Sequence, residues 1–434
     1  MIGLEVRRRT PPISLKSTPR ALIYIIGTYP LLTTTFIDRE IMGLLRSGVG
    51  LRVIAIRQPP VDTPLSDEQK ALQRDVTYLI PIHRGRLLLG HVYFALFRPR
   101  RFFGALAYLL TRPHPSLKAR IKSLIHFGEG VYASFVARNM SCDEFHAHFA
   151  DRAATVAMVA GRLLDKPYSL SIHAGADIFV NPVLLREKIR GARHVVTCTS
   201  YNLSYIAALA GEDLRSKMSH VHHGLDLSLY RPGSPAAVDP PLILSVGQLA
   251  ERKGFDQLVG ACRRLADEGY RFHCRILGEG PHRELLEGLI DRLSLQRFVE
   301  LRGALSHAEV LEHYRQAAMF VLPCIRTSGG DIDGIPNVLA EAMASQIPVV
   351  STDLPAISEL VLDEENGLLV PSGDEGALAA AMRRLLDEPT LREALGTRGR
   401  ETVQDIFDVD VNVRRFAATM WPRWFDRGEG RADA

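Results

Sequence analysis

The stretch DGIPNVLAEAMA (333–344) joins a short glycine-containing loop to the start of a helix. Pro336 suits a first helical position, because an N–H there would lack a partner anyway. Asn337 and the residues after it then present free backbone N–H groups at a helix N-terminus, which attract anions. Asp333 and Glu341 bracket this helix start. The stretch therefore predicts a pocket for a ligand that carries both a phosphate and several hydroxyl groups.

The composition is that of an ordinary globular protein. The chain has 434 residues, of which 46% are hydrophobic and 24% are charged, enough for two or three domains. No apolar run reaches the length of roughly 18–20 residues that a membrane span needs. The N-terminus also lacks the apolar core of a signal peptide, so a cytoplasmic protein is expected. Five dispersed cysteines predict free thiols and no zinc site.

Charge divides the chain in two. Residues 1–233 contain 31 Lys and Arg against 17 Asp and Glu, and the remainder contains 22 against 32. The change coincides with RPGSP (231–235), which Pro240 and Pro241 follow. A charge change across a stretch rich in proline, glycine and serine indicates a domain boundary. We therefore predict two domains.

Each half repeats the pattern of an apolar strand, a loop and a helix. Short apolar runs at 21–26, 51–56, 167–172 and 242–246 are each followed by a loop that contains glycine or polar residues. Such repeats predict parallel sheets covered on both faces, with ligands at the carboxyl ends of the strands. The first turn of either half lacks the GxGxxG fingerprint, which argues against dinucleotide binding.

Three loops at predicted strand ends carry candidate site residues. Gly27 follows the first strand, where it could bring backbone close to a ligand or serve only the turn. His173 follows 167–172 and is either a site residue or a structural histidine. Arg252 and Lys253 form the loop after 242–246, and two adjacent cations suit a diphosphate, although such loops are common. His222 and His223 could suggest a metal, but no nearby carboxylate or cysteine completes a ligand set.

Residues 84–126 are basic and aromatic. The sequence has no acidic residue between Asp75 and Glu129, and Leu87–Phe97 is an apolar run too short to span a membrane. These features predict a face for an anionic membrane surface. Nucleic acid is the rival interpretation, without an accompanying motif, and a solvated basic surface over core helices is the third.

Several motifs together resemble the retaining glycosyltransferases of family 4. They are YPLLTTTFIDREI (29–41), SIHAGADIF (171–179), HHGLDLSLYRP (222–232), SVGQLAERKGFD (245–256), ILGEGP (276–281), DIDGIPNVLAEAMASQIPVV (331–350) and ENGLLVPSGD (365–374). They follow the family's order along nearly the whole chain, and are most similar to the branch that builds exopolysaccharides, colanic acid-like polymers and lipopolysaccharide cores.

The resemblance implies an α/β protein of the GT-B class, in which two facing Rossmann-like domains with doubly wound parallel sheets enclose a deep cleft. We expect an N-terminal extension (1–18), an acceptor-side domain (19–236), a donor-binding domain (237–405) and a C-terminal helix that crosses back to the first domain (406–434).

Family roles can be transferred to matching positions. The resemblance implies that Lys253, with Arg252, binds the donor diphosphate, that Glu341 binds the ribose, that Asp333 holds hydroxyls of the transferred sugar, and that His173 lines the sugar pocket. The expected catalytic residues are thus His173, Asp333 and Lys253. The expected donor-binding residues are Gly27, Arg252, Lys253, Gly278, Arg302, Gly334, Ile335, Asn337, Val338 and Glu341.

Three positions depart from the family pattern. Asp333 stands where the family has glutamate, Gln248 where it often has arginine, and Pro336 where glycine is common. The expected reaction is metal-independent and retaining, needs no cofactor, and moves a hexose from a GDP- or UDP-linked donor to a lipid-linked or polysaccharide acceptor at the inner membrane face. A non-catalytic nucleotide-sugar-binding scaffold and a nucleotide-sugar epimerase remain alternatives. Nucleic acid is not an expected partner.

Overall fold

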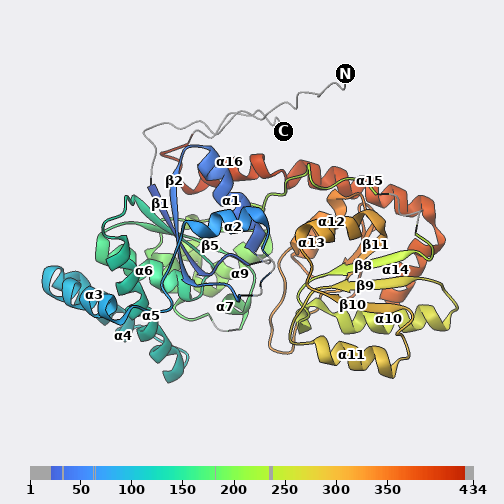
Figure 1. The fold of residues 1–434 in the computed structure, drawn as a ribbon, viewed down its shortest axis with the longest axis horizontal. Coiled ribbons are helices and arrows are strands. Elements are labelled where there is room, and N and C mark those ends of the chain that lie inside the picture. The colour runs from blue at the N-terminus through green and yellow to red at the C-terminus, as the bar shows by residue number, and fades with distance from the viewer. Residues whose placement is uncertain are drawn as a thin grey trace, which may run out of the picture.

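The computed structural model describes residues 21–31, 34–61, 63, 65–180, 182–233 and 238–425. Two parallel sheets, each with helices on both faces, lie side by side (Figure 1). This arrangement confirms the predicted α/β class with two doubly wound domains. The N-terminal extension predicted for residues 1–18 lies outside the described residues.

The first sheet has seven strands in the order β3-β2-β1-β4-β5-β6-β7. Their bounds are β1 Ala21–Thr28, β2 Gly50–Arg57, β3 Val76–Tyr78, β4 Glu144–His148, β5 Tyr168–Ile172, β6 Val195–Thr197 and β7 Met218–His220. The helices are α1 Thr35–Arg46, α2 Asp67–Arg74, α3 Arg84–Phe97, α4 Pro99–Thr111, α5 Leu117–Ala137, α6 Arg152–Leu164, α7 Ala176–Phe179, α8 Leu185–Gly191 and α9 Ser200–Ala210. Strand order reverses between β1 and β4, and ligand sites of such sheets form at this reversal.

The second sheet has six strands in the order β10-β9-β8-β11-β12-β13. They are β8 Leu242–Val246, β9 His273–Leu277, β10 Val299–Gly303, β11 Ala317–Leu322, β12 Val349–Thr352 and β13 Leu368–Val370. Around them lie α10 Phe255–Asp267, α11 Arg283–Arg292, α12 His307–Gln316, α13 Asn337–Ala344, α14 Glu375–Asp387 and α15 Pro389–Ile406. Here strand order reverses between β8 and β11.

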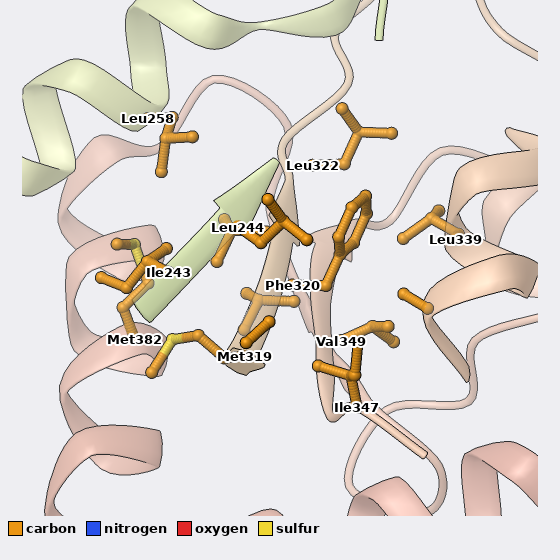
Figure 2. Close-up of a cluster of buried hydrophobic side chains, with 14 of the residues drawn as sticks. Ile243, Leu244, Leu258, Met319, Phe320, Leu322, Leu339, Ile347, Val349 and Met382 are labelled. Carbon is orange, nitrogen blue, oxygen red and sulfur yellow. The ribbon is translucent and has the colours of Figure 1, made fainter. Parts of the chain in front are cut away.

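The core of the second domain explains why its central strand β11 is apolar throughout. All six residues of β11 are buried, because helices cover both faces of the sheet. Figure 2 shows Met319 toward Met382 of α14 and Phe320 toward Leu339 of α13, so successive residues of β11 serve opposite faces. Helix α13, which follows residues 333–336, therefore packs on the sheet through its apolar side. Its N-terminus is left at the carboxyl ends of the strands.

The chain returns to the first domain at its C-terminal end. Helix α16, Val409–Met420, packs against α1, where a Cβ on Gly43 would lie 2.7 Å from the side chain of Val413. Trp421 and Trp424 are buried in the same cluster as Tyr24 of β1. In Figure 1, α15 lies over the second domain and α16 over the first. The last described helix thus completes the core of the first domain.

Helices α3, α4 and the first turns of α5 lie on the side of the first domain away from the second (Figure 1). They expose a cluster of large apolar side chains, among which Leu96 is 69% and Phe97 is 72% exposed. The aromatic residues within 84–126 differ in burial. Phe94 and Phe102 are buried in the core, whereas Phe97 and Phe103 are exposed. Within the part of the chain that the structure describes, no helix is long and apolar enough to cross a bilayer.

Two local predictions were wrong. Gly27 and Thr28 belong to β1 rather than to a turn after it, because their backbone continues the pairing with β2 as far as Arg57. Pro336 precedes α13 as its capping residue, with φ −66° and ψ 123°, instead of occupying the first helical position. The helix N-terminus therefore begins at Asn337.

Candidate active site

The predicted site residues gather where the two strand-order reversals face each other. Lys253 follows β8 and Asp333 follows β11 in the second domain, while His173 follows β5 in the first. Gly334 lies against the first domain, since a Cβ there would come 3.2 Å from the Cβ of Ala174. The described residues thus form a contact between the domains at the carboxyl ends of both sheets.

Lys253, Arg252 and Asp333 form a compact ion-pair cluster. The Nζ of Lys253 lies 2.8 Å from Oδ2 of Asp333, and Nε of Arg252 donates to Oδ1 of Asp333 at 3.1 Å. Burial raises the pKa of Asp333. The charges of Lys253 and Arg252 lower that pKa by more than burial raises it, so the net shift is downward. Burial likewise lowers the pKa of Lys253, and Asp333 and Cys324 reverse that shift. Asp333 and Lys253 are therefore both charged at neutral pH.

The backbone explains how Lys253 reaches this place. A short 3₁₀ turn, Glu251–Lys253, ends at Gly254, whose φ is 64°. A Cβ on Gly254 would come 2.0 Å from the carbonyl oxygen of Pro323, directly after β11. Glycine therefore lets the loop after β8 pack onto the end of β11 and brings Lys253 beside Asp333. Arg252 also donates to Oε1 of Gln248 at 3.2 Å, so Gln248 holds this arginine in place.

Glu341 lies one turn into α13 and is buried between the domains. Its Oε1 is 3.4 Å from a guanidinium nitrogen of Arg39 on α1, and its Oε2 accepts from the hydroxyl of Tyr314 at 3.3 Å. Arg39 also donates to the hydroxyl of Tyr230 at 3.4 Å. Burial, followed by the charge of Glu341, holds the pKa values of Tyr230 and Tyr314 well above the ordinary value. The Glu341 carboxylate is therefore neutralised by the opposite domain and held by a protonated phenol.

His173 is the middle ring of a histidine chain and differs from a simple pocket-lining residue. Its Nε2 lies 3.2 Å from Nδ1 of His148, and its Nδ1 lies 3.1 Å from Nε2 of His223. His223 in turn lies 3.3 Å from Oδ1 of Asn337, and its ring stacks on Phe36 at 4.2 Å. Both nitrogens of His173 are thus engaged within the protein, and His223 is the ring that reaches the N-terminus of α13.

One group in this region has the composition of a metal site. Ligand atoms of His173, Cys198 and His223 all lie within 4.8 Å of one another. The two histidines are hydrogen-bonded to each other, however, and burial raises the pKa of the Cys198 thiol to about 12. Because a thiol must lose its proton to bind a metal, this geometry does not favour one. Glu40, His146 and His148 form a similar group. Glu40 accepts a hydrogen bond from Tyr24, and His146 is hydrogen-bonded to Ser169.

The remaining expected residues are placed unevenly. Gly278 lies beside the site, because a Cβ there would come 1.8 Å from the carbonyl oxygen of Gly247 after β8. Ile335 and Val338 are half-buried on either side of the α13 start. Gly27 lies in β1, where an added Cβ would come 3.7 Å from Oδ2 of Asp151. Arg302 sits at the end of edge strand β10 and pairs with Glu300, so no described contact joins it to the ion-pair cluster.

Sequence reasoning missed several residues of this region. Arg39, Glu40 and Tyr314 were not singled out for a role, His148 was interpreted as a structural histidine, and His223 was weighed only as one of a metal-binding pair. Glu359 was missed as well, although its carboxylate accepts the backbone N–H groups of Ser200 at 2.8 Å and Tyr201 at 2.6 Å, which caps α9 from the other domain. The pattern TFIDRE within 29–41 was the one sequence signal that included Arg39 and Glu40.

Part of this arrangement lies in a segment that is similar to known proteins. Residues 228–402 match the family model described as glycosyl transferases group 1, and the match includes Lys253, Asp333 and Glu341. The second domain is thus similar to the group 1 glycosyltransferases. Over nearly its whole length, the chain is similar to the putative colanic acid biosynthesis glycosyltransferase WcaL of Salmonella typhimurium, with 29% identity over 407 residues that cover 92% of this chain and 98% of the relative.

Two further relatives match shorter segments. WcaL of Escherichia coli is 38% identical over 209 residues, 48% of this chain and 51% of the relative. The amylovoran biosynthesis glycosyltransferase AmsK of Erwinia amylovora is 39% identical over 185 residues, 42% of this chain and 46% of the relative. The chain thus spans about half the length of these two relatives.

Solved structures support the fold. The chain resembles sucrose-phosphate synthase from Thermosynechococcus elongatus with a TM-score of 0.69 and 18% identity, over 93% of this chain and 98% of that one. HepE from Anabaena, solved with UDP and glucose, gives a TM-score of 0.67 and 14% identity over 92% of this chain and 99% of that one. The GT-B expectation is thereby confirmed.

Proposed function

We propose that this glycosyltransferase moves a hexose, with retention of configuration and without a metal, from a nucleoside diphosphate sugar to a lipid-linked oligosaccharide or polysaccharide. The observation that carries the proposal is the cluster of Lys253 and Arg252 around Asp333, at the N-terminus of α13. Two fixed cations beside a helix N-terminus form a site for a diphosphate. Glu341 lies one turn further along the same helix, within reach of the hydroxyls of a nucleotide ribose.

The departing nucleoside diphosphate requires positive charge where its negative charge develops. The Lys253 ammonium and the Arg252 guanidinium are held by ion pairs before any ligand arrives, so they need little reorganisation. The helix dipole adds partial positive charge at the N-terminus of α13. These protein groups can take the part that a metal ion plays in other transferases, which supports a metal-independent reaction.

Asp333 is better suited to positioning than to covalent attack. Both of its oxygens contact cations, and Oδ2 additionally accepts from Sγ of Cys324 at 3.4 Å. A carboxylate stabilised in this way is a poor nucleophile. Retention by attack on the same face of the sugar, with Asp333 holding sugar hydroxyls, is therefore the mechanism we favour.

Relatives and structural neighbours suggest the substrate class. Those named for colanic acid and amylovoran biosynthesis point to an exopolysaccharide. A GDP-mannose-dependent mannosyltransferase of Mycolicibacterium smegmatis, 29% identical over 54% of this chain, points to a GDP-linked donor, whereas HepE with UDP-glucose points to a UDP-linked one. Both bases remain within the proposal.

The exposed apolar surface of the first domain supports work at the inner membrane face. Leu96 and Phe97 of α3 and Phe103 of α4 are more than half exposed. The same segment is rich in basic residues, and a basic residue near an anionic leaflet contributes about 1 kcal/mol of attraction. These residues are Arg84, Arg86, Arg98, Arg100, Arg101, Arg112, Lys118, Arg120 and Lys122. We propose that α3, α4 and the start of α5 lie on the cytoplasmic leaflet as a peripheral attachment.

A transfer assay tests the enzymatic proposal. Membranes with lipid-linked acceptors are incubated with radiolabelled UDP- and GDP-sugars in the presence of EDTA. Lys253→Ala and Glu341→Ala should each lower turnover by at least about 10²-fold, because each removes charge or hydroxyl recognition at the donor. Near-normal turnover in both variants would refute the proposal, and loss of wild-type activity in EDTA would refute metal independence.

A non-catalytic scaffold is the second candidate, favoured by the short, fully ion-paired Asp333. Such a protein would bind a nucleotide sugar, but it would show neither slow hydrolysis of that sugar nor transfer to any acceptor. An epimerase would instead convert the sugar with no acceptor present. Isothermal titration with each nucleotide sugar, followed by product analysis, separates the three outcomes.

A further inference from the structure

Three aromatic rings from two helices of the first domain lie together at its surface. Tyr201 and Tyr205 are one turn apart on α9, and their ring centroids are 6.1 Å apart. The ring of Phe179, on α7, lies 4.9 Å from that of Tyr205 and 6.5 Å from that of Tyr201. All three residues are half-buried, so each keeps part of its surface exposed. These three side chains are called the aromatic triad below.

The two tyrosine hydroxyls of the aromatic triad are not used within the protein. Among the described residues neither hydroxyl has a hydrogen-bond partner, and neither oxygen is shielded from solvent. By contrast, the hydroxyl of Tyr314 in the second domain donates to Glu341 at 3.3 Å. A half-exposed tyrosine with a free hydroxyl offers a ligand both an apolar ring and a hydrogen-bonding group. The triad presents two such tyrosines side by side.

Both helices that carry the aromatic triad begin at the contact between the domains. A Cβ on Gly334 would lie 3.2 Å from the Cβ of Ala174, just before α7, and 3.6 Å from Nδ2 of Asn202 on α9. The carboxylate of Glu359 in the second domain accepts the backbone N–H of Tyr201 at 2.6 Å. In Figure 1, α7 and α9 lie on the side of the first domain that faces the second. The triad therefore lies beside the candidate active site.

The chemistry of the aromatic triad fits a sugar ring. A pyranose has C–H bonds on its faces and hydroxyls around its rim. Aromatic rings carry negative charge on their faces, so they attract the C–H hydrogens, while the phenol hydroxyls can bond to the rim. A lipid chain would leave both phenols without a partner. The groups proposed to bind the diphosphate and ribose, Arg252, Lys253 and Glu341, all belong to the second domain, so the triad is available to a different sugar.

We propose that the aromatic triad is a subsite for the acceptor sugar, in which a pyranose ring packs against Phe179, Tyr201 and Tyr205 and its hydroxyls bond to the two phenols. This inference rests on the proposed function, because only a transferase needs an acceptor. Glu359 holds the start of α9 against the second domain, and it thereby positions Tyr201 relative to the donor loop. The sugar bound here is the part of the acceptor that lies next to the donor.

Fluorine NMR of the full-length protein labelled with fluorotyrosine tests sugar binding without any transfer. Single Tyr→Phe variants assign Tyr201, Tyr205 and Tyr270 among the 12 tyrosines. The probes are the methyl glycosides of glucose, galactose and mannose, added with UDP or GDP present. At least one glycoside should shift the Tyr201 and Tyr205 resonances saturably and leave that of Tyr270, whose hydroxyl donates to Asp387, unchanged. No shift with any glycoside, or equal shifts of all three resonances, would overturn the proposal.

Tyr205→Ala and Phe298→Ala form a matched pair for kinetics, because Phe298 is a half-buried ring in the second domain that contacts Phe272 at 5.1 Å. With membranes that carry lipid-linked acceptors, Tyr205→Ala should raise the acceptor KM about three- to tenfold through the lost ring contact. Tyr205→Phe keeps the ring and should raise it less. The donor KM should stay unchanged, as should both constants in Phe298→Ala. An unchanged acceptor KM in Tyr205→Ala, or an equal rise of its donor KM, would contradict the assignment.

The acceptor subsite and the proposed function can fail separately. If the wild type transfers no sugar, the proposed function fails, and the fluorine spectra still show whether the aromatic triad binds a glycoside. If the wild type transfers sugar but neither triad tyrosine responds to a glycoside, the proposed function stands and the acceptor subsite is wrong.

Discussion

The guanidinium of Arg39 lies 3.4 Å from the carboxylate of Glu341, and this ion pair joins the two domains across the candidate active site. Both side chains are about nine-tenths buried, with exposed fractions of 10% and 8%. Removal of one partner from an ion pair in such surroundings costs several kcal/mol of stability, because the other charge remains buried and unpaired. The contact between the two domains and the charge balance of Glu341 therefore depend on the same ion pair.

Arg39→Met should raise the donor KM by at least about tenfold and lower kcat less, because Glu341 loses its neutralising partner before the donor binds. Initial rates over a range of donor concentrations measure both constants. Glu341→Gln combined with Arg39→Met should cost less than the sum of the single changes, by about 1–3 kcal/mol. Strict additivity would show that the pair does not couple the domains.

Asp333→Asn should bind free UDP or GDP several-fold more tightly than the wild type and yet transfer sugar more slowly. The carboxylate that now contacts Lys253 at 2.8 Å repels an incoming diphosphate, and asparagine removes that repulsion together with the sugar contact. Titration calorimetry with the diphosphate, and with the uncharged nucleoside as control, measures the change. Asp333→Glu retains the charge and should leave diphosphate affinity within about threefold. Weaker diphosphate binding by the asparagine variant would contradict this account.

Glu359→Gln should weaken the contact that caps α9 from the second domain. The Glu359 carboxylate accepts two backbone N–H groups at 2.8 and 2.6 Å, and a charged acceptor at a helix N-terminus contributes about 0.3–1 kcal/mol beyond a neutral one. We expect a donor KM two- to fivefold higher and a more extended molecule by small-angle scattering. Glu365→Gln, an exposed change in the same domain, is the control. Identical scattering profiles for the two variants would exclude a role in closure.

Stability should rise with pH between about 4 and 6.5, because burial lowers the folded pKa of His223 to about 4 while an unfolded histidine titrates near 6.5. Within this window the unfolded chain binds more protons, so the contribution is complete above pH 6.5 and is lost as the pH falls toward 4. For His223 this amounts to on the order of 1 kcal/mol at pH 5.5. Urea unfolding at pH 7.5 and 5.5 should show a smaller difference for His223→Gln than for the wild type; an equal difference would exclude His223 as the source.

Flotation with anionic liposomes tests the exposed apolar cluster of α3 and α4. The wild type should float with the vesicles at low salt and less at high salt, as basic residues lose their attraction. Phe97→Asp should abolish flotation, whereas Leu285→Asp, a similar change at a 51% exposed position on α11, should not. Absence of wild-type binding at low salt would refute the membrane interpretation.

Local sequence patterns were sufficient for most strands of the two sheets but not for their order. Apolar runs followed by loops predicted the loops after β8 and β11, which carry Lys253 and Asp333, whereas the ion pairs between these residues were not predicted. The histidine chain was not predictable in the same way. It depends on His148 ending β4 beside Ser171 of β5, and on a loop that returns His223 to His173 from 50 residues away.

Contacts between the domains were equally hidden. Arg39 lies in a helix where it reads as an ordinary polar residue, and its partner Glu341 is 302 positions further along the chain. Pro336 was misplaced by one residue because proline is tolerated both at the first helical position and just before it. Periodicity determines which face of a helix is buried, but not which residue of a distant domain covers its end.

The return of α16 to the first domain has a consequence for synthesis of the protein. The first domain is discontinuous, since Trp421 and Trp424 complete the core around Tyr24 and β1. While these residues are still inside the ribosome, residues 21–233 lack one wall of their core, whereas 242–406 already contain every strand of the second sheet. We therefore expect the second domain to fold before the core of the first is complete, so a chain truncated before Val409 should aggregate through its N-terminal half.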